Sequence, residues 1–432
     1  MPEARGYLPH TPRDLEIMLA KVGASSLEDL FTQIPESVRL PGAPDLGAAL
    51  DEQGLTRLLG AMSRANTGAD LVCFAGGGYY DRYLPAALQA LLSRGEFVTA
   101  YTPYQPEVSQ GTLQVTFEFQ TMISELTGLP AATAGLYDGS TALAEAAAMA
   151  RAATGRSLVA CAPGVHPEWV EVLRTYTRGD GVVPLGEAGD LADVAAVIVQ
   201  QPDYRGRVHD LGRLCRERPA GALAIAAVDP ATLGVLEAPG RLGADIVVGE
   251  GQGIGLPLGY GGPYLGFMAA AEALLRRLPG RICGQSRDAA GHRAFVLTLQ
   301  AREQHIRRAR ATSNVCTNEA LCALAVTVYL SLLGPAGLRR LGELCLARAH
   351  YAAARLAEIP GVALAEADAP FFAEFALAVP DAAQVVDGLA ARGYLVGPVL
   401  GPRELLVAVT EKRDRAEIDG LAAALREVLA GA

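Results

Sequence analysis

LAIAAV, at residues 223–228, is one of five short apolar stretches that set the expected fold class of this chain. The other four are SLVAC (157–161), AAVIVQ (195–200), ADIVVG (244–249) and LGFMAA (265–270). Predicted helices alternate with these strands, namely LPAALQALL (84–92), VTFEFQTMISELTG (115–128), STALAEAAAMARAATG (140–155) and DLGRLCRER (210–218). Apolar strands that alternate with amphipathic helices indicate an α/β domain with a mainly parallel sheet.

Two further regions flank this predicted domain. Thr11 before Pro12 indicates the start of a helix, and Ser26 with Asp29 forms a predicted capping box. An apolar helix ends at Gly334–Pro335, after which two predicted strands, FFAEFALAV and ELLVAVT, lie among three helices. The sequence therefore predicts a helical arm (1–60), a large α/β domain (61–334) and a small C-terminal α/β domain (335–432).

The composition excludes several classes of function. A formal net charge of −10 leaves no basic excess for binding a nucleic acid. The seven cysteines form no C-x-x-C pair, which favours buried thiols in a reducing cytoplasm. No export signal is expected at the N-terminus, and the most apolar stretch, of about 14 residues, falls short of the ~20 needed to cross a bilayer. We therefore expect a cytoplasmic protein with no membrane or nucleic-acid partner.

Short motifs alone leave several interpretations open. GEGQGIGLP (249–257) has the spacing of a phosphate-binding loop, but neither the following helix nor the acidic residue of a nicotinamide site is present, which favours a structural loop. EFVTAYTPYQPEVSQGTLQ (96–114) and AGGGYYDRYLP (75–85) could each line a site or pack at an interface. In YDGSTALAEA (137–146) the predicted helix start could hold an anion, or could be N-capped by Asp138 or Ser140. No metal-ligand spacing and no G-x-S-x-G motif is present.

Longer runs of sequence are far more specific. Six such runs are spread over residues 7–318: GGGYYDRYLPA, EFVTAYTPYQPEVSQGTLQ, LYDGSTALAEA, VVGEGQGIGLPLGYGGPYLGF, RRLPGRICGQSRDAAGHRAFVLTLQAREQHIRRARATSNVCTN and YLPHTPRD. Together they resemble subunit 1 (α) of the two-subunit glycine dehydrogenase (decarboxylating), the P-protein of the glycine cleavage system. The resemblance implies a fold-type I pyridoxal-phosphate-dependent transferase fold. It also implies decarboxylation of glycine, whose aminomethyl group passes to the lipoyl arm of the H-protein.

The resemblance also locates the cofactor positions of such an enzyme. Asp229 resembles the aspartate that pairs with the pyridinium nitrogen, and His166 resembles the histidine that stacks on the ring. The helix start at Asp138, Gly139 and Ser140 is a further vestigial position. The lysine of the Schiff base is expected at about Gly253 and is absent, since the chain has only two lysines, Lys21 and Lys412. This implies that the chain anchors no cofactor and that the paralogous subunit 2 (β) holds pyridoxal 5'-phosphate.

Because fold-type I active sites lie at a subunit boundary, this chain is expected to contribute residues to its partner's site. The expected contributors are Tyr101, Thr102, Tyr104, Gln105, Glu107, Gly261, Gly262, Ser313 and Asn314. The expected partners are subunit 2, the lipoylated H-protein and glycine, and no metal is expected. The alternatives are a self-contained enzyme that uses Lys21 or Lys412, and a non-catalytic binding or regulatory paralogue.

Overall fold

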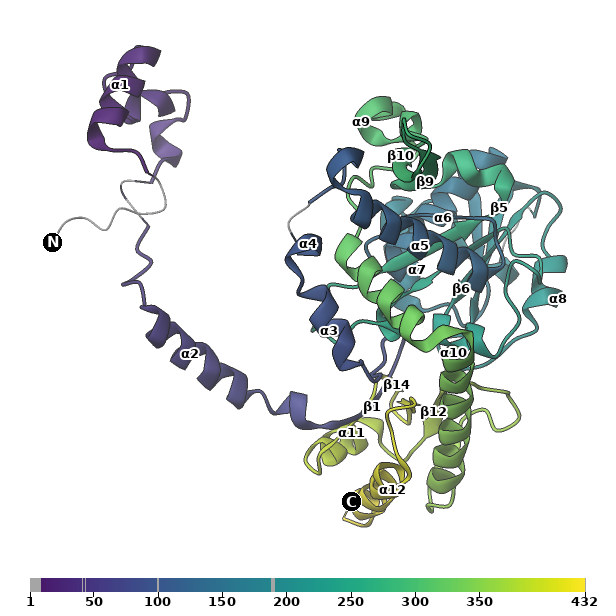
Figure 1. Ribbon diagram of the computed structural model, residues 1–432. Helices are drawn as coiled ribbons and strands as arrows, with labels where there is room; N and C mark the ends of the chain where they lie inside the picture. Colours follow the sequence, from purple (N-terminus) through teal and green to yellow (C-terminus); the bar gives the residue numbers. More distant parts are fainter. Residues whose placement is uncertain (1–8, 41, 43, 99–100, 188–190, 432) are drawn as a thin grey trace. The chain divides into compact units, whose positions relative to one another are not determined.

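The computed structural model describes residues 9–40, 42, 44–98, 101–187 and 191–431 (Figure 1). The chain divides into two units, Met1–Thr67 and Gly68–Ala432. The first eight residues of the predicted arm, and Ala432 at the end of the predicted small domain, lie outside the described residues. The division into an arm, a large domain and a small domain stays a prediction.

The first unit consists of helices and turns. Helix α1 (Pro12–Val22) begins at Thr11, which forms a capping box with Asp14, so the predicted helix start is confirmed. Ser26 N–H donates to Asp29 Oδ2 (3.0 Å) and Asp29 N–H donates to Ser26 Oγ (3.3 Å), as predicted, and Asp29 lies within the short 3-10 helix η1 (Glu28–Phe31). The remaining helices are η2 (Glu36–Val38) and α2 (Glu52–Ala65). None of these helices buries a residue, so the unit has no apolar core of its own among the described residues.

The second unit is built around a seven-stranded sheet, in the order β2-β8-β7-β6-β5-β3-β4. The strands are β2 (Ala131–Ala132), β8 (Gly266–Ala270), β7 (Ile246–Glu250), β6 (Leu223–Val228), β5 (Val194–Gln201), β3 (Leu158–Cys161) and β4 (Val182–Pro184). From β7 to β4 all neighbours are parallel, whereas β8 is antiparallel to both β7 and β2. The mainly parallel sheet and all five predicted strands are confirmed.

Helices cover both faces of this sheet (Figure 1). Val197 and Val199 of β5 pack in one apolar cluster with Phe119 of α5 (Gln110–Thr127), while Ile198 packs in a second cluster with Leu143 of α6 (Gly139–Thr154). Because successive side chains of a strand point to opposite faces, β5, which is apolar from Val194 to Val199, supplies both cores. The other helices of this region are α3 (Ala86–Leu92), α4 (Gly95–Val98), α7 (Pro167–Tyr176) and α8 (Leu211–Arg216).

Helix α10 (Ala320–Ala357) joins the sheet to the C-terminal part of the chain (Figure 1). Its backbone breaks at Gly334 (φ 60°) just before Pro335, where the sequence predicts that one helix ends and another begins. It is the one helix within the described ranges that is long and apolar enough to cross a membrane. Half of its most apolar window is nevertheless buried inside the protein. The helix also contacts α3, α5 and α12, as a core helix does.

The C-terminal part contains a second, smaller sheet of order β11-β12-β15-β14. Its strands are β11 (Ala363–Leu364), β12 (Glu374–Ala378), β14 (Val399–Gly401) and β15 (Glu404–Ala408), covered by α11 (Ala382–Ala390) and α12 (Arg415–Ala430). The two predicted strands correspond to β12 and β15. The sequence did not reveal that β1 (Val72–Ala75) pairs in parallel with β13 (Tyr394–Gly397), which ties residues 72–75 to the C-terminal part.

A hairpin also projects from the sheet region, beside the loop that precedes α5 (Figure 1). Its strands are β9 (Ile282–Arg287) and β10 (Arg293–Thr298), followed by the short helix α9 (Gln304–Arg307). Gln110 at the start of α5 binds the backbone of Phe295 in β10 through both its amide oxygen and its amide nitrogen. This places the YTPYQPE loop and the hairpin side by side.

Candidate functional site

A small cavity lies where four parallel strands present their carboxyl ends. Its volume is about 40 Å³, and β3, β5, β6 and β7 all end beside it. The lining residues are Gly78, Tyr80, His166, Trp169, Gln200, Pro202, Ala227, Val228, Asp229, Glu250 and Gly253. The structure therefore brings together three residues that the sequence singled out far apart in the chain: His166, Asp229 and Gly253. This edge is where open parallel sheets bind their ligands.

His166 is fixed by the chain itself. It begins α7, its backbone N–H donates to Gln200 Oε1 (2.8 Å), and its Nε2 lies 2.9 Å from the carbonyl oxygen of Gly77. Its Nδ1 accepts the backbone N–H of Glu168 (3.2 Å), so Nε2 carries the proton in the neutral ring. Burial lowers the pKa of His166. The imidazole is therefore a neutral, oriented wall of the cavity.

Asp229, at the end of β6, is paired with a buried arginine that the sequence analysis did not single out. Arg82 Nη2 lies 3.3 Å from Asp229 Oδ2, and Arg82 Nη1 lies 3.1 Å from Glu411 Oε2. The Arg82 side chain is 1% exposed, so its charge is compensated by these two carboxylates rather than by water. A Cβ built on Gly253 would lie 3.1 Å from Arg82 Nε. The guanidinium thus stands against the position expected for the lysine.

Glu250, at the end of β7, occupies the first turn of α6. Its Oε2 accepts the N–H of Gly139 (2.9 Å), and its Oε1 accepts the N–H groups of Gln252 (2.9 Å) and Leu265 (3.0 Å). Burial raises the pKa of Glu250 to about 7, although the three N–H donors oppose the shift. This carboxylate lies at the start of α6, where the sequence left open either a bound anion or an N-cap.

Asp138 provides the other part of this helix start. Its Oδ1 accepts the N–H of Thr141 (2.8 Å) and the hydroxyl of Ser140 (2.6 Å). Of the two N-caps that the sequence left open, Asp138 is therefore the one that forms. In the first turn of α6, the N–H groups of Gly139 and Thr141 thus donate to carboxylates of the protein.

The loop of residues 75–85 closes the cavity from the other side. Gly77 N–H and the Tyr80 hydroxyl donate to the buried Glu374 (2.6 and 3.1 Å). The backbone N–H and carbonyl of Tyr80 pair with the side-chain amide of Gln252 (2.9 and 3.0 Å). Burial raises the pKa of Glu374 to about 7. The loop is thus anchored both to the sheet and to the small C-terminal sheet.

The two lysines do not line this cavity. Lys412 follows Glu411, but its ammonium pairs with both carboxylate oxygens of Asp81 (2.8 and 2.9 Å). Lys21 belongs to α1 of the first unit. No group of three or more His, Cys, Asp or Glu side chains that could hold a metal occurs in the part of the chain that the structure describes.

The predicted contributors to a partner's site lie elsewhere. None of the nine lines the cavity. In the YTPYQPE loop, Tyr101 is 84% exposed and Gln105 and Glu107 are exposed. Asn314 is also exposed, while Ser313 is half-buried and accepts the N–H of Val315 (3.1 Å). Gly261 and Gly262 adopt φ of 109° and 129°, which side chains rarely allow.

Two side chains of the YTPYQPE loop and three from the segments after it form a group that we call the Arg281 cluster: Thr102, Tyr104, Arg281, Arg302 and Glu303. Arg281 Nη2 donates to the Tyr104 hydroxyl (2.8 Å), and the guanidinium lies over the Tyr104 ring. The structure has seven buried side-chain nitrogen or oxygen atoms without a hydrogen-bond partner in its described ranges. Five of them belong to this cluster: Thr102 Oγ1, Arg281 Nε, Arg302 Nε and Nη2, and Glu303 Oε1. The sequence indicated the loop but not the arginines of the cluster.

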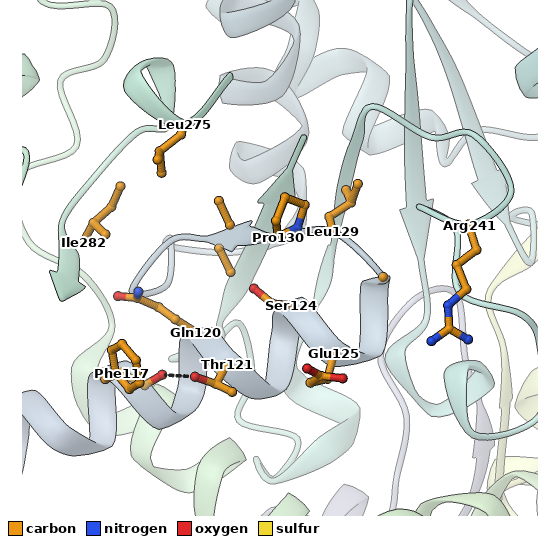
Figure 2. A pocket seen from close by; sticks show the side chains of 13 residues that line it. Phe117, Gln120, Thr121, Ser124, Glu125, Leu129, Pro130, Arg241, Leu275 and Ile282 are labelled. Atoms are coloured by element: carbon orange, nitrogen blue, oxygen red, sulfur yellow. Dashed lines mark hydrogen bonds between the residues drawn. The ribbon is translucent and has the colours of Figure 1, made fainter. Parts of the chain in front are cut away.

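A larger cavity, of about 600 Å³, lies along α5 (Figure 2). Gln120, Ser124 and Glu125 line it from the helix, and Arg241, Leu275 and Ile282 from other segments. It contains none of the residues that the sequence singled out. The cavity at the strand ends therefore remains the better candidate for the predicted site.

Comparison with known proteins gives one consistent result. A family model described as "Glycine cleavage system P-protein" matches residues 5–425. Proteins of Moorella thermoacetica (49% identity, 98% of this chain and 100% of that protein) and Desulforamulus reducens (48% identity, 97% and 99%) are both named probable glycine dehydrogenase (decarboxylating) subunit 1.

Solved structures agree with these sequence matches. A crystal structure of glycine decarboxylase (P-protein) of the glycine cleavage system, in inhibitor-bound form, is 47% identical to this chain, with a TM-score of 0.90 over 98% of this chain and 99% of that chain. The glutamate decarboxylase of Lactobacillus brevis, 15% identical with a TM-score of 0.66 over 93% of this chain and 97% of that chain, shares the fold alone. The predicted fold-type I architecture is thereby confirmed.

Proposed function

The chain belongs to the glycine cleavage system P-protein family, and on that basis we propose that it is the subunit of glycine dehydrogenase (decarboxylating) that does not anchor the cofactor. A paralogous second subunit with a lysine holds pyridoxal phosphate, whose ring acts as the electron sink for decarboxylation of glycine. The aminomethyl group then passes to the lipoyl arm of the H-protein. The assembly works in the cytoplasm.

One observation carries this proposal: among the residues that the structure describes, none that lines the cavity at the strand ends has a primary amine. A Schiff base needs an amine, which neither glycine nor arginine supplies. Gly253 stands where the lysine is expected, with Arg82 beside it. Lys412 is held by Asp81, so the self-contained enzyme that uses Lys412 would first have to break this ion pair.

The Arg281 cluster supports a role in completing a second chain. A buried polar atom without a partner costs about 1–3 kcal/mol, so the five unpaired atoms of these residues favour groups supplied from outside this chain. Aromatic side chains of this region are exposed: Tyr104 of the cluster is 58% exposed, and Tyr101 of the same loop is 84% exposed. Tyrosine and arginine are the side chains that protein interfaces favour. We infer that the partner subunit covers this surface.

The test is to purify the chain alone and together with its lysine-bearing paralogue. Each sample is treated with pyridoxal phosphate and borohydride, and glycine-dependent CO2 release is measured with lipoylated H-protein. We expect activity only in the mixture and covalent cofactor only on the second subunit. Cofactor trapped on the isolated wild-type chain would overturn the proposal, as would full activity of the second subunit alone.

Two matched variants test the alternative enzyme. Lys21→Arg and Lys412→Arg preserve the positive charge but remove the primary amine, so both mixtures should keep full activity. Loss of activity in Lys412→Arg, with the complex still formed, would favour the self-contained enzyme.

A further inference from the structure

We propose that the cavity at the strand ends is a former cofactor site that is now closed. Arg82 blocks the lysine position, and Glu250 takes the place that the cofactor phosphate would have at the start of α6. Restoring the lysine alone therefore does not restore cofactor binding. This rests on the proposed function and goes beyond it. A missing lysine could leave an open pocket, whereas the contacts of this chain describe a closed one.

Arg82 is the first part of the seal. Its side chain is 1% exposed and lies between Asp229 and Glu411, with Nη1 also 3.1 Å from the Cys345 sulfur. Because a Cβ on Gly253 would already lie 3.1 Å from Arg82 Nε, a lysine there could extend only by displacing the guanidinium. Asp229, which the family resemblance pairs with a pyridinium nitrogen, is already neutralised by this arginine. Arg82 therefore fills space that a cofactor ring would need and pairs with the carboxylate that would bind the ring nitrogen.

Glu250 is the second part. A phosphate bound at the start of α6 would use the N–H of Gly139 and its neighbours. Glu250 Oε2 already accepts that N–H, and Asp138 accepts the N–H of Thr141. An incoming phosphate would meet two carboxylates instead of free donors. Above about pH 7, where Glu250 is ionised, these like charges repel a phosphate and oppose the usual preference of a helix start for anions.

The remaining space agrees with this interpretation. Ligand pockets measure roughly 300–1,000 Å³. The cavity here measures about 40 Å³, which holds a few water molecules at most. The residues present therefore do not fit pyridoxal phosphate.

The experiment measures covalent cofactor on this chain within the purified two-subunit complex. The variants are Gly253→Lys and the triple variant Arg82→Ala, Glu250→Gln, Gly253→Lys, with exposed Arg339→Lys as the control for nonspecific labelling. The lysine nitrogen adds to the aldehyde carbon of pyridoxal phosphate and water leaves. Borohydride then delivers a hydride to the C=N carbon to give a stable secondary amine. Intact mass of the separated subunits reports the label on each chain.

We expect Gly253→Lys to carry no more label than the control, and the triple variant to approach one label per chain. Equal labelling of the single and triple variants, whether high or at background, would overturn the proposal. The proposed function fails in a different way, through label on the wild-type chain itself.

A second measurement does not require the triple variant to fold. Glu250→Ala frees the N–H groups of Gly139, Gln252 and Leu265, so inorganic phosphate should raise the Tm of the Glu250→Ala complex by about 1–3 °C at about ten times its Kd. The wild-type complex should show no such rise. An equal rise in both would overturn the assignment of Glu250 as the internal anion.

Discussion

Two polar clusters of this chain differ in how completely their atoms are paired. At the strand ends, Glu250, Asp229 and Gln252 each have partners within the chain, and among the cavity's polar groups described above only Arg82 Nε lacks one. In the Arg281 cluster, Thr102, Arg302 and Glu303 each leave buried atoms unpaired. The first cluster is complete within one chain, and the second is not.

Under the proposed function, the first cluster corresponds to a former cofactor site and the second to a surface that the partner subunit completes. A catalytic pocket keeps polar groups available for its ligand, whereas a structural polar cluster satisfies them internally. By this criterion the residues that resemble cofactor ligands, His166 and Asp229, belong to structure. We propose that the side chains of the Arg281 cluster serve the function instead, through contact with the partner subunit.

The largest effect on stability is expected when Arg82, the buried cation at the strand ends, is replaced. Arg82→Met leaves Asp229 and Glu411 buried without a counter-charge, and should destabilise the protein by about 3–5 kcal/mol in urea or thermal denaturation. The matched control is Arg339→Met, which removes an exposed pair with Glu343 and should cost about 0.2–1 kcal/mol. Equal losses in the two variants would mean that the cavity's ion pairs are not structural.

The next effect concerns pH. The folded pKa of Glu250, about 7, lies above its ordinary value of 4.5, so the folded state holds a proton that the unfolded state has lost. The stability contributed by this proton is present below about pH 4.5 and is lost as pH rises to about 7. Between these limits the wild type should lose on the order of 3 kcal/mol through this group.

Glu250→Gln isolates that contribution. The amide does not titrate, so the difference in Tm between wild type and variant should narrow as pH rises from 5 to 7.5. Glu374→Gln provides a parallel case, because burial raises its pKa to about 7 as well. A constant difference across this range would contradict the assignment of a buried, titrating carboxylate at α6.

The strands around the cavity show how much of the fold could be predicted from the sequence. The parallel strands β3, β5, β6 and β7 were predicted from short apolar runs, and their shared carboxyl edge brings His166, Asp229 and Gly253 together. The antiparallel direction of β8 could not be predicted, because a strand buried on both faces shows the same apolar run in either direction. The two-residue strand β2 is too short to show a pattern.

The seal itself was missed for a different reason. Arg82 and Asp229 are 147 positions apart, and Arg82 and Glu411 are 329 apart, so only the folded chain brings them together. The available signals were a single arginine within the aromatic run YYDRY, and a glutamate immediately before the glycines where a lysine was expected. Neither identifies its partner without the β1–β13 pairing that positions residues 75–85.

A smaller effect is expected in the incomplete cluster. Arg281→Met removes the donor to Tyr104 and an Nε without a partner in this chain. If the second subunit supplies that partner, the binding free energy between the subunits should fall by about 1–3 kcal/mol, or roughly five- to 150-fold in Kd. Analytical ultracentrifugation measures this, with Arg287→Met on the exposed part of β9 as control. Unchanged affinity would place the partner elsewhere.

The smallest effect is expected at Thr102, where it tests most directly whether the Arg281 cluster is incomplete within one chain. Thr102→Val removes a buried hydroxyl whose Oγ1 has no partner in this chain and replaces it with a methyl group of similar size. The isolated chain should keep its stability or gain up to about 1 kcal/mol, because an unsatisfied polar group is removed. The complex should instead lose about 1 kcal/mol of association free energy, because the partner's group then lacks the hydroxyl. The opposite signs matter more than the magnitudes, since a loss of stability in the isolated chain would show that Thr102 is already satisfied without a second subunit.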